Sequence, residues 1–298
     1  REASRDILKR GRRGRPAHLR KLCAAPFVVY APSTRLVSYA VSVLRGAPAL
    51  PIDEVLPALR SALERRRGAV VVAPPGAGKT TRIPLDLLDA PWRGDGRVLV
   101  LEPRRIAARA AAQQMARLLG EEPGGRIGYR VRLESRVGAR TRVEVVTEGI
   151  LTRMLQEDPS LDGVAAICFD EFHERHLPSD LGLALALESR AVLREDLRLV
   201  VMSATLEAAP VARVLADDAG DAPIIASEGR SHPVETHLRP IREGVPFARG
   251  VATAVQRAVS EFDGDALVFL PGIAEIGRVR ALLEEEGASG AAVQVLHG

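Results

Sequence analysis

The sequence predicts an α/β fold built on a mostly parallel sheet. Short apolar runs rich in β-branched residues recur along residues 51–298. Strands that are buried on both faces, as in a parallel sheet, have this unbroken apolar pattern. Segments with helical spacing separate several of the runs, which is the alternation expected of βαβ crossovers. The predicted strands are Ala69–Ala73, Val98–Leu101, Val143–Val146, Val164–Phe169, Leu197–Met202 and Ala222–Ala226.

Three helices and a half-exposed strand are also expected in this part of the chain. Apolar residues recur at helical spacing over 52–66, which predicts an amphipathic helix. Helices over 105–119 and 181–193 would connect predicted strands. The segment Gly128–Ser135 alternates apolar and charged side chains, which indicates a strand with one exposed face.

The pattern divides the chain into three parts. Residues 1–50 are basic and lack a sustained apolar period, so we expect an extension, a linker or a mistaken start of translation. Residues 51–228 contain the predicted sheet, and residues 229–298 begin a second unit. The features of that unit are the turn-rich Ser227–Pro233, a helix around 247–261 and a strand over Ala266–Leu270. One or two βα units cannot bury both faces of a parallel sheet, so we expect the second domain to be incomplete.

Formal charge is concentrated in the first fifty residues. These carry 11 basic and 2 acidic residues, whereas residues 51–298 carry 31 basic and 36 acidic residues. Nucleic-acid contacts by the body of the chain must therefore use local basic patches rather than a global field. Only three lysines occur, and Lys79 is the only one after residue 21.

Cysteine usage and hydropathy favour a reducing, cytoplasmic location. Cys23 and Cys168 lie far apart, and Cys168 stands in an apolar run, so we expect a buried free thiol rather than a disulfide. No uncharged apolar stretch reaches about 18 residues, so no membrane span is expected. No segment has the pattern of a secretory signal.

The segment Ala73–Thr81 has the pattern of a phosphate-binding loop. It reads Ala-Pro-Pro-Gly-Ala-Gly-Lys-Thr-Thr, with Ala73 in place of the usual first glycine, and it links a predicted strand to a predicted helix. Glycines let backbone N–H groups surround a phosphate, and the helix N-terminus adds a favourable dipole. Lys79 would neutralise the β- and γ-phosphates, and Thr80 would bind Mg²⁺. The expected nucleotide-binding residues are Gly76, Ala77, Gly78, Lys79, Thr80 and Thr81.

Two adjacent carboxylates, Asp170 and Glu171, follow the predicted strand Val164–Phe169. Ligands of open parallel sheets bind at the carboxyl ends of the strands, so this pair should face the same edge as the phosphate loop. Asp170 is expected to hold Mg²⁺, and Glu171 to orient and deprotonate the attacking water. Two carboxylates this close repel each other unless they share a cation. We therefore expect Glu171, Asp170 and Lys79 to be catalytic.

The tripeptide Ser203-Ala-Thr205 ends another predicted strand. Its hydroxyl groups could hydrogen-bond His173 or the two carboxylates. The tripeptide alone is a weak signal, and its value comes from its order and spacing relative to the other motifs.

Five short motifs follow one another in the sequence: Ala73–Thr81, Glu102-Pro-Arg-Arg105, Thr147-Glu-Gly149, Asp170-Glu-Phe-His173 and Ser203-Ala-Thr205. In this order they resemble the motif set of superfamily 2 helicases of the DEAH/RHA type. Gly128-Tyr-Arg-Val-Arg132 and Gly229-Arg-Ser-His-Pro-Val-Glu235 add to the resemblance, which covers about residues 51–298. It implies a RecA-like P-loop NTPase domain over 51–228 and a truncated second RecA-like domain over 229–298. It also implies an ATP-dependent RNA helicase that uses ATP and Mg²⁺ and binds single-stranded RNA, with DNA as an alternative.

The resemblance assigns roles to further residues. His173, Ser203 and Thr205 match positions that couple hydrolysis to strand movement. Residues that match contacts to the nucleic-acid backbone are Pro103, Arg104, Arg105, Thr147 and Gly149. The arginine role also has a physical basis, because guanidinium groups at the end of a strand can fork onto phosphates.

Motors of this family hydrolyse ATP between two RecA-like domains, and the second domain supplies arginine fingers. Such a finger is worth about 10³–10⁵ in rate. The sequence ends at Gly298, before the motifs that would carry the fingers. We therefore expect residues 1–298 to bind nucleotide, to hydrolyse it poorly and not to unwind nucleic acid.

Three alternatives stay open at this point. A DNA-directed motor, or a nucleic-acid-stimulated ATPase that does not unwind, would carry the same motifs. A phosphate-loop kinase or GTPase would not need Ser203-Ala-Thr205, and the sequence lacks a guanine-reading Asn/Thr-Lys-x-Asp element. Residues 1–50 could form a basic nucleic-acid tether, since clustered charges release counterions on binding. The sequence does not indicate an oligomeric state.

Overall fold

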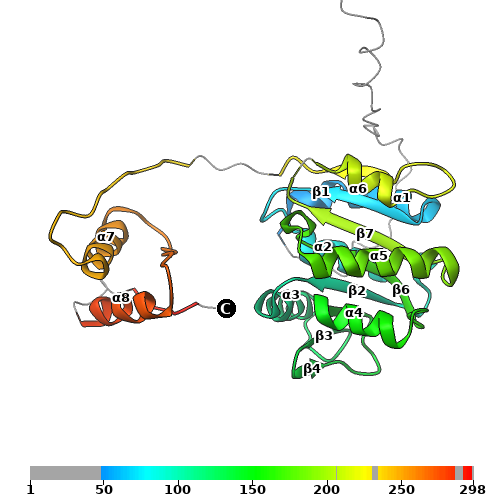
Figure 1. Ribbon diagram of the computed structural model, residues 1–298, viewed down its shortest axis with the longest axis horizontal. Coiled ribbons are helices and arrows are strands. Elements are labelled where there is room, and N and C mark those ends of the chain that lie inside the picture. Colours follow the sequence, from blue (N-terminus) through cyan, green and yellow to red (C-terminus); the bar gives the residue numbers. More distant parts are fainter. Residues whose placement is uncertain (1–47, 206, 230–233, 286–290, 297–298) are drawn as a thin grey trace, which may run out of the picture.

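The computed structural model describes residues 48–205, 207–229, 234–285 and 291–296. Within these residues an eight-stranded sheet is covered by helices, and two further helices stand apart from it (Figure 1). The expectations for residues 1–47 and for the motif residues Arg230–Pro233 lie outside the described residues.

The sheet is parallel except at one edge. Its strand order is β4-β3-β5-β2-β6-β7-β1-β8, and only β4 pairs antiparallel with its neighbour. The strands are β1 (Gly68–Val72), β2 (Arg97–Glu102), β3 (Ile127–Val131), β4 (Glu134–Arg136), β5 (Val143–Thr147), β6 (Val164–Phe169), β7 (Arg198–Ser203) and β8 (Ile224–Ala226). All six predicted strands form, and the mostly parallel α/β fold is confirmed.

Helices cover both faces of the sheet because the strands are apolar on both faces. Val71 of β1 packs in the cluster formed with α1, α2 and α3, whereas Val70 and Val72 pack in the cluster formed with α4, α5 and α6. The helices are α1 (Leu56–Arg65), α2 (Lys79–Asp86), α3 (Arg105–Leu118), α4 (Glu148–Glu157), α5 (Leu177–Val192) and α6 (Ala209–Val214). The predicted helices over 52–66, 105–119 and 181–193 correspond to α1 with the preceding 3₁₀ turn Pro51–Glu54, to α3 and to α5.

The prediction of one half-exposed strand over Gly128–Ser135 was wrong. The chain turns back at Leu133, whose φ of 67° is left-handed, and β4 pairs antiparallel with β3. Tyr129 and Val131 are buried as the alternation predicts, but Leu133 is 95% exposed at the turn. A period of two places side chains on alternate faces and does not reveal where the chain reverses.

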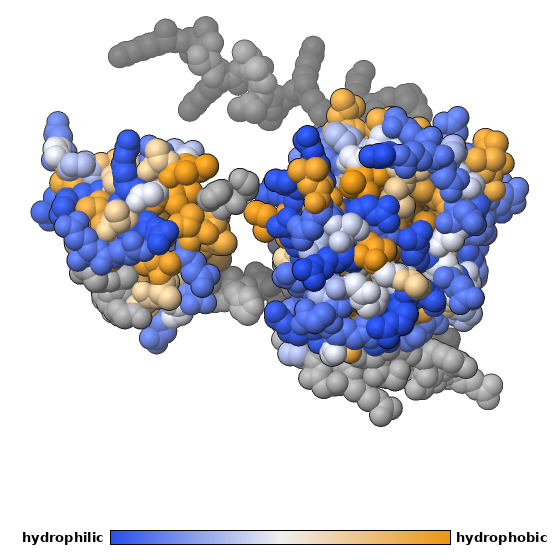
Figure 2. All heavy atoms as spheres, turned by 90° about the horizontal axis from the view of Figure 1, so that it is seen from below, coloured by the Kyte–Doolittle hydropathy of each residue, from blue (hydrophilic) through white to orange (hydrophobic). Residues whose placement is uncertain are grey.

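The described residues after the sheet form α7 (Phe247–Glu261) and α8 (Ile273–Glu285), which pack against each other around Ala252, Val279 and Leu283. The predicted helix over 247–261 is confirmed. The predicted strand over Ala266–Leu270 is not formed, and Leu267 and Phe269 are exposed. Figure 2 shows hydrophobic side chains at the surface of this part of the chain. A strand requires a neighbouring strand for its backbone hydrogen bonds, and no described residue pairs with this segment.

Among the described residues, no helix has the length and apolar character needed to cross a membrane. Cys168 is a buried free cysteine on β6, as expected, and burial raises the pKa of its thiol.

Candidate active site

The phosphate-loop motif leaves β1 at the carboxyl edge of the sheet and ends in α2. Gly78 has a φ of 98°, and a Cβ at this position would lie 2.6 Å from Leu50 Cδ1. The left-handed backbone therefore favours glycine, and a Cβ here would also displace the Leu50 side chain of the preceding segment. The Ile52 N–H donates to Ala77 O at 3.1 Å, which holds the loop against the 3₁₀ turn before α1.

Lys79 is the first residue of α2 and is only 4% exposed. Its Nζ donates to Ala73 O at 2.5 Å and to Pro74 O at 3.2 Å. These carbonyl groups satisfy a buried ammonium that would otherwise be costly to bury. These bonds hold the lysine within the loop, with its charge where a phosphate would bind.

Thr80 and Asp170 meet across the sheet edge. Thr80 Oγ1 donates to Asp170 Oδ2, which joins the start of α2 to the end of β6. A hydroxyl and a carboxylate are hard oxygen donors of the kind that Mg²⁺ prefers. No group of three His, Cys, Asp or Glu side chains in the described part of the chain could hold a metal. Mg²⁺ usually takes few protein oxygens and keeps several waters, so Thr80 and Asp170 fit this ion.

Glu171 directly follows Asp170 in a strained backbone conformation. Its φ is 49°, and its backbone N–H donates to Asp170 Oδ1 at 2.8 Å, which holds the Asp170 carboxylate against the backbone of Glu171. Left-handed backbone at a non-glycine residue costs about 1–3 kcal/mol and clusters at functional sites. Burial and then the charge of Asp170 raise the pKa of Glu171, which is the direction a general base requires.

Glu102, which sequence reasoning did not select, is a third carboxyl group beside this pair. It ends β2, is 3% exposed and hydrogen-bonds Asp170. Burial and then the charge of Asp170 raise the pKa of Glu102 to about 9. The raised pKa favours the protonated form of Glu102, which can donate to Asp170. Its position at the end of a strand beside Pro103 could have indicated a site residue. Nothing in the sequence showed which carboxyl group it would face.

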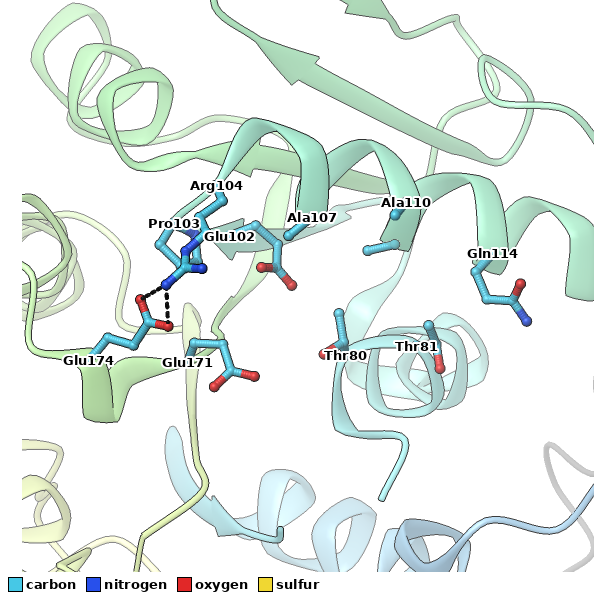
Figure 3. A pocket seen from close by; sticks show the side chains of 11 residues that line it. Thr80, Thr81, Glu102, Pro103, Arg104, Ala107, Ala110, Gln114, Glu171 and Glu174 are labelled. Carbon is cyan, nitrogen blue, oxygen red and sulfur yellow. Dashed lines mark hydrogen bonds and ion pairs between the residues drawn. The ribbon is translucent and has the colours of Figure 1, made fainter. Parts of the chain in front are cut away.

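A cavity of about 480 Å³ opens beside these groups. Figure 3 shows Thr80, Glu102 and Glu171 turned toward the same space. The opposite wall is formed by one face of α3, from Ala107 to Gln114. Alanine side chains on this face leave room that larger residues would fill. The wall was not predicted, because in the sequence its alanines resemble ordinary helix residues.

The residues expected to couple hydrolysis to movement also gather here. Ala204 N–H donates to His173 Nδ1 at 3.3 Å, and Glu171 Oε2 lies 3.4 Å from the same nitrogen. The expected bond from a hydroxyl group to His173 is not formed. Instead Ser203 Oγ lies 3.3 Å from Thr205 Oγ1, and Thr205 N–H donates to Ser203 Oγ at 3.1 Å. His173 Nδ1, which accepts from the Ala204 N–H group just after β7, therefore lies beside the Glu171 carboxylate without donating a hydrogen bond to it.

The residues expected to contact nucleic acid follow two neighbouring strands at the same edge. Pro103, Arg104 and Arg105 follow β2, and both arginines are exposed. Thr147 ends β5, and Gly149 lies in the exposed first turn of α4. The last residues of β2 and β5, Glu102 and Thr147, are partners in the sheet register. The two sets are therefore adjacent, and they share an edge with the phosphate loop.

Comparison with known proteins agrees with this arrangement. A family model described as DEAD/DEAH box helicase matches residues 54–214. The chain is 46% identical over 249 residues to the ATP-dependent RNA helicase HrpB of Escherichia coli, an alignment that covers 84% of this chain and 30% of that protein. It is 34% identical over 232 residues to the ATP-dependent RNA helicase HrpA of Escherichia coli, with 76% and 18% covered.

A crystal structure of the Escherichia coli DEAH/RHA helicase HrpB has a TM-score of 0.71 and 47% identity to this chain, covering 79% of this chain and 30% of that one. The chain thus spans less than a third of the length of these relatives. The resemblance to DEAH/RHA-type helicases, with HrpB as the bacterial member that the motifs favour, is confirmed. The chain belongs to the DEAD/DEAH box helicase family.

Proposed function

We propose that the chain contains the ATP-binding part of an ATP-dependent RNA helicase. One observation carries this proposal: the phosphate loop, the Asp170–Glu171 pair and the exposed Arg104 stand together at one edge of a parallel sheet. The names of HrpB and HrpA support RNA as the nucleic acid. We propose residues 51–228 as a RecA-like domain, residues 229–298 as the start of a second one, and the cytoplasm as the compartment.

In the proposed reaction the loop residues Gly76 to Thr81 bind the phosphates of ATP. Lys79 leaves the carbonyl groups of Ala73 and Pro74 and neutralises the β- and γ-phosphates. Bound Mg²⁺, held by Thr80 and Asp170, would neutralise phosphate charge. The loop and the magnesium ligands together present the γ-phosphate to the carboxylate edge of the site.

Glu171 accepts a proton from the attacking water in the proposed reaction. The raised pKa of Glu171 makes it a stronger base than an exposed carboxylate, and its side chain lines the cavity. We propose that His173 couples hydrolysis to Ser203–Thr205: its Nδ1 accepts from the Ala204 N–H group and lies beside Glu171, so a change at Glu171 alters the surroundings of that bond.

Pro103, Arg104, Arg105, Thr147 and Gly149 bind the sugar–phosphate backbone in this proposal. Contacts of this type set the register of the protein on the strand and carry no sequence information. The proposed partner is therefore single-stranded RNA of any sequence, with single-stranded DNA as the alternative.

An ATPase assay of the complete gene product tests the proposal. We expect hydrolysis to increase with single-stranded RNA and to increase less with DNA of the same sequence. Equal stimulation by DNA would favour the DNA-directed motor, and stimulation without duplex separation would favour an ATPase that does not unwind. No ATP hydrolysis under any of these conditions would contradict the proposal.

Residues 1–298 alone provide a second test. We propose that they bind ATP, hydrolyse it poorly and do not unwind a duplex, because the arginine fingers of such motors are worth about 10³–10⁵ in rate and come from the second domain. Robust RNA-stimulated turnover by residues 1–298 would contradict this part of the proposal.

A further inference from the structure

Three helices begin side by side at the carboxyl edge of the sheet. Arg104, Thr147 and His176 are the N-cap residues of α3, α4 and α5. These helices follow β2, β5 and β6, which are consecutive neighbours in the order β5-β2-β6. The first two helix starts contain the proposed backbone contacts, and the third follows the Asp170–Glu171 pair by a few residues.

A continuous series of polar contacts joins the three helix starts. Arg104 Nη2 donates to Glu174 Oε1 at 3.0 Å and to Glu174 Oε2 at 3.3 Å, as Figure 3 shows. His176 Nε2 lies 3.3 Å from Glu174 Oε2, and His176 Nδ1 lies 3.2 Å from Glu148 Oε1. Ser179 Oγ also donates to Glu148 Oε1, at 2.6 Å. We call Glu174, His176 and Glu148 the carboxylate–histidine bridge.

The bridge connects elements with different proposed tasks. Glu148 lies between the proposed backbone contacts Thr147 and Gly149, and Arg104 is itself a proposed backbone contact. Glu174 belongs to the 3₁₀ turn Phe172–Glu174, which directly follows Glu171. Side-chain contacts therefore join both contact loops to the segment that carries the proposed base.

Arg104 can take part in the bridge and bind a phosphate at once. Only its Nη2 atom contacts Glu174, and its side chain is exposed. A guanidinium group has five N–H donors, so Nε and Nη1 keep donors for a phosphate oxygen. A phosphate bound there would be in the same network as Glu174.

The bridge adds little stability on its exposed side. The side chains of Arg104 and His176 are 71% and 41% exposed, whereas those of Glu174 and Glu148 are 27% and 14% exposed, and ion pairs with exposed partners contribute about 0–1 kcal/mol to stability. His176 presents one ring nitrogen to each of two carboxylates that belong to different elements. The geometry therefore serves to fix the distance between two loops rather than to strengthen the fold.

We propose that the carboxylate–histidine bridge is a positioning device that couples nucleic-acid binding at Arg104 and Thr147 to the placement of Glu171. This inference rests on the proposed function, and it assigns positioning roles to Glu148, Glu174 and His176. None of the three reacts with ATP, and their effect passes through Arg104, Thr147 and Glu171.

Substitution of His176 tests the bridge in the complete gene product. His176→Ala removes both central contacts, and His176→Gln keeps a polar side chain whose one amide nitrogen cannot occupy the positions of both ring nitrogens. We expect kcat at saturating single-stranded RNA to fall about tenfold in both variants, which is within the 5–150-fold range typical of coupling between two sites. The RNA-free rate and the melting temperature should stay at wild-type values.

Arg175→Gln is a matched control in the same segment. The Arg175 guanidinium pairs with Asp180 at 2.9 Å and stacks on Phe172, and it makes no contact with the bridge among the described interactions. We expect this variant to keep the stimulation by RNA. The salt dependence of RNA binding gives a second readout, because each lost phosphate contact lowers its slope. Arg104→Ala should lower the slope, whereas His176→Ala should leave it unchanged.

Each outcome distinguishes the bridge from the proposed function. If wild-type ATPase is stimulated by RNA and both His176 variants keep that stimulation, the positioning role of the bridge is wrong and the proposed function stands. The positioning role is also wrong if His176→Gln lowers the RNA-stimulated rate and the RNA-free rate equally, which is what a purely structural role predicts. If RNA does not stimulate the wild type, the proposed function fails and the inference fails with it.

Discussion

The runs Leu197–Met202 and Ala266–Leu270 have similar apolar sequences but different structures. Strand β7 lies between β6 and β1, and its central residues are completely buried. Residues 266–270 pair with no described strand, and Phe269 is 87% exposed. The comparison shows that an apolar run becomes a strand only where neighbours supply its backbone hydrogen bonds and cover its side chains. Substitutions in residues 51–228 and in residues 229–298 should therefore differ in their effects.

Phe169→Ala and Phe269→Ala should give the largest difference in stability. Phe169 is fully buried at the end of β6, where it packs edge to face on Phe172. Truncation of a buried phenylalanine costs about 3–5 kcal/mol. We expect this loss in the free energy of unfolding of residues 1–298, measured by urea denaturation. Phe269→Ala should stay within about 0.5 kcal/mol of wild type, and a comparable loss in both variants would remove the distinction between the two parts.

Lys79→Ala should weaken ATP binding, whereas removal of a positive charge from residues 229–298 should not. A hydrogen bond to a charged group contributes about 1.5–3 kcal/mol, which corresponds to an ATP affinity lower by roughly tenfold to a hundredfold. Titration calorimetry with ATP measures the change. Arg280→Ala is the control, because Arg280 is exposed on α8 and pairs with Glu284 four residues later. Equal ATP affinity of Lys79→Ala and wild type would contradict the assigned phosphate loop.

Glu102→Gln should change the pH dependence of stability. The folded-state pKa of Glu102 is about 9, against 4.5 for an exposed glutamate. The folded protein therefore holds a proton between these values that the unfolded chain releases. Because unfolding releases this proton, the free energy of unfolding falls as pH rises, by about 1.4 kcal/mol per pH unit.

Denaturation of residues 1–298 with a metal chelator between pH 5 and 9 measures this slope. Glutamine stays neutral and can still donate to Asp170, so the Glu102→Gln variant should show a flatter profile than wild type. Identical profiles would mean that Glu102 is ionised in the folded protein.

The strands and the order of motifs could be predicted because their signals are local. A buried parallel strand such as Val164–Phe169 is apolar on both faces, and Lys79 stands out as the only lysine of the sheet domain. The carboxyl edge then brings the motifs together for topological reasons. The sequence therefore predicted that Ala73–Thr81 and the Asp170–Glu171 pair share one edge of the sheet, where Thr80 donates to Asp170.

The features that were missed depend on contacts between distant segments. Burial, and then the charge of Asp170, which is far away in sequence, raise the pKa of Glu102. The turn at Leu133 and the missing strand at Ala266–Leu270 depend on which strands are neighbours. His176 meets Glu148 only because β5 and β6 flank β2. None of these contacts has a local pattern that a single sequence reveals.

Glu171→Gln in the complete gene product is the most direct test of the assigned ATP site. The amide keeps the size of the side chain, so ATP affinity should stay near the wild-type value. It cannot accept a proton from water. Steady-state hydrolysis with RNA should fall by about 10²–10⁴, the usual contribution of a positioned general base. Binding titration and a phosphate-release assay measure the two quantities on one preparation. Hydrolysis at the wild-type rate would contradict the assignment of Glu171 as the base.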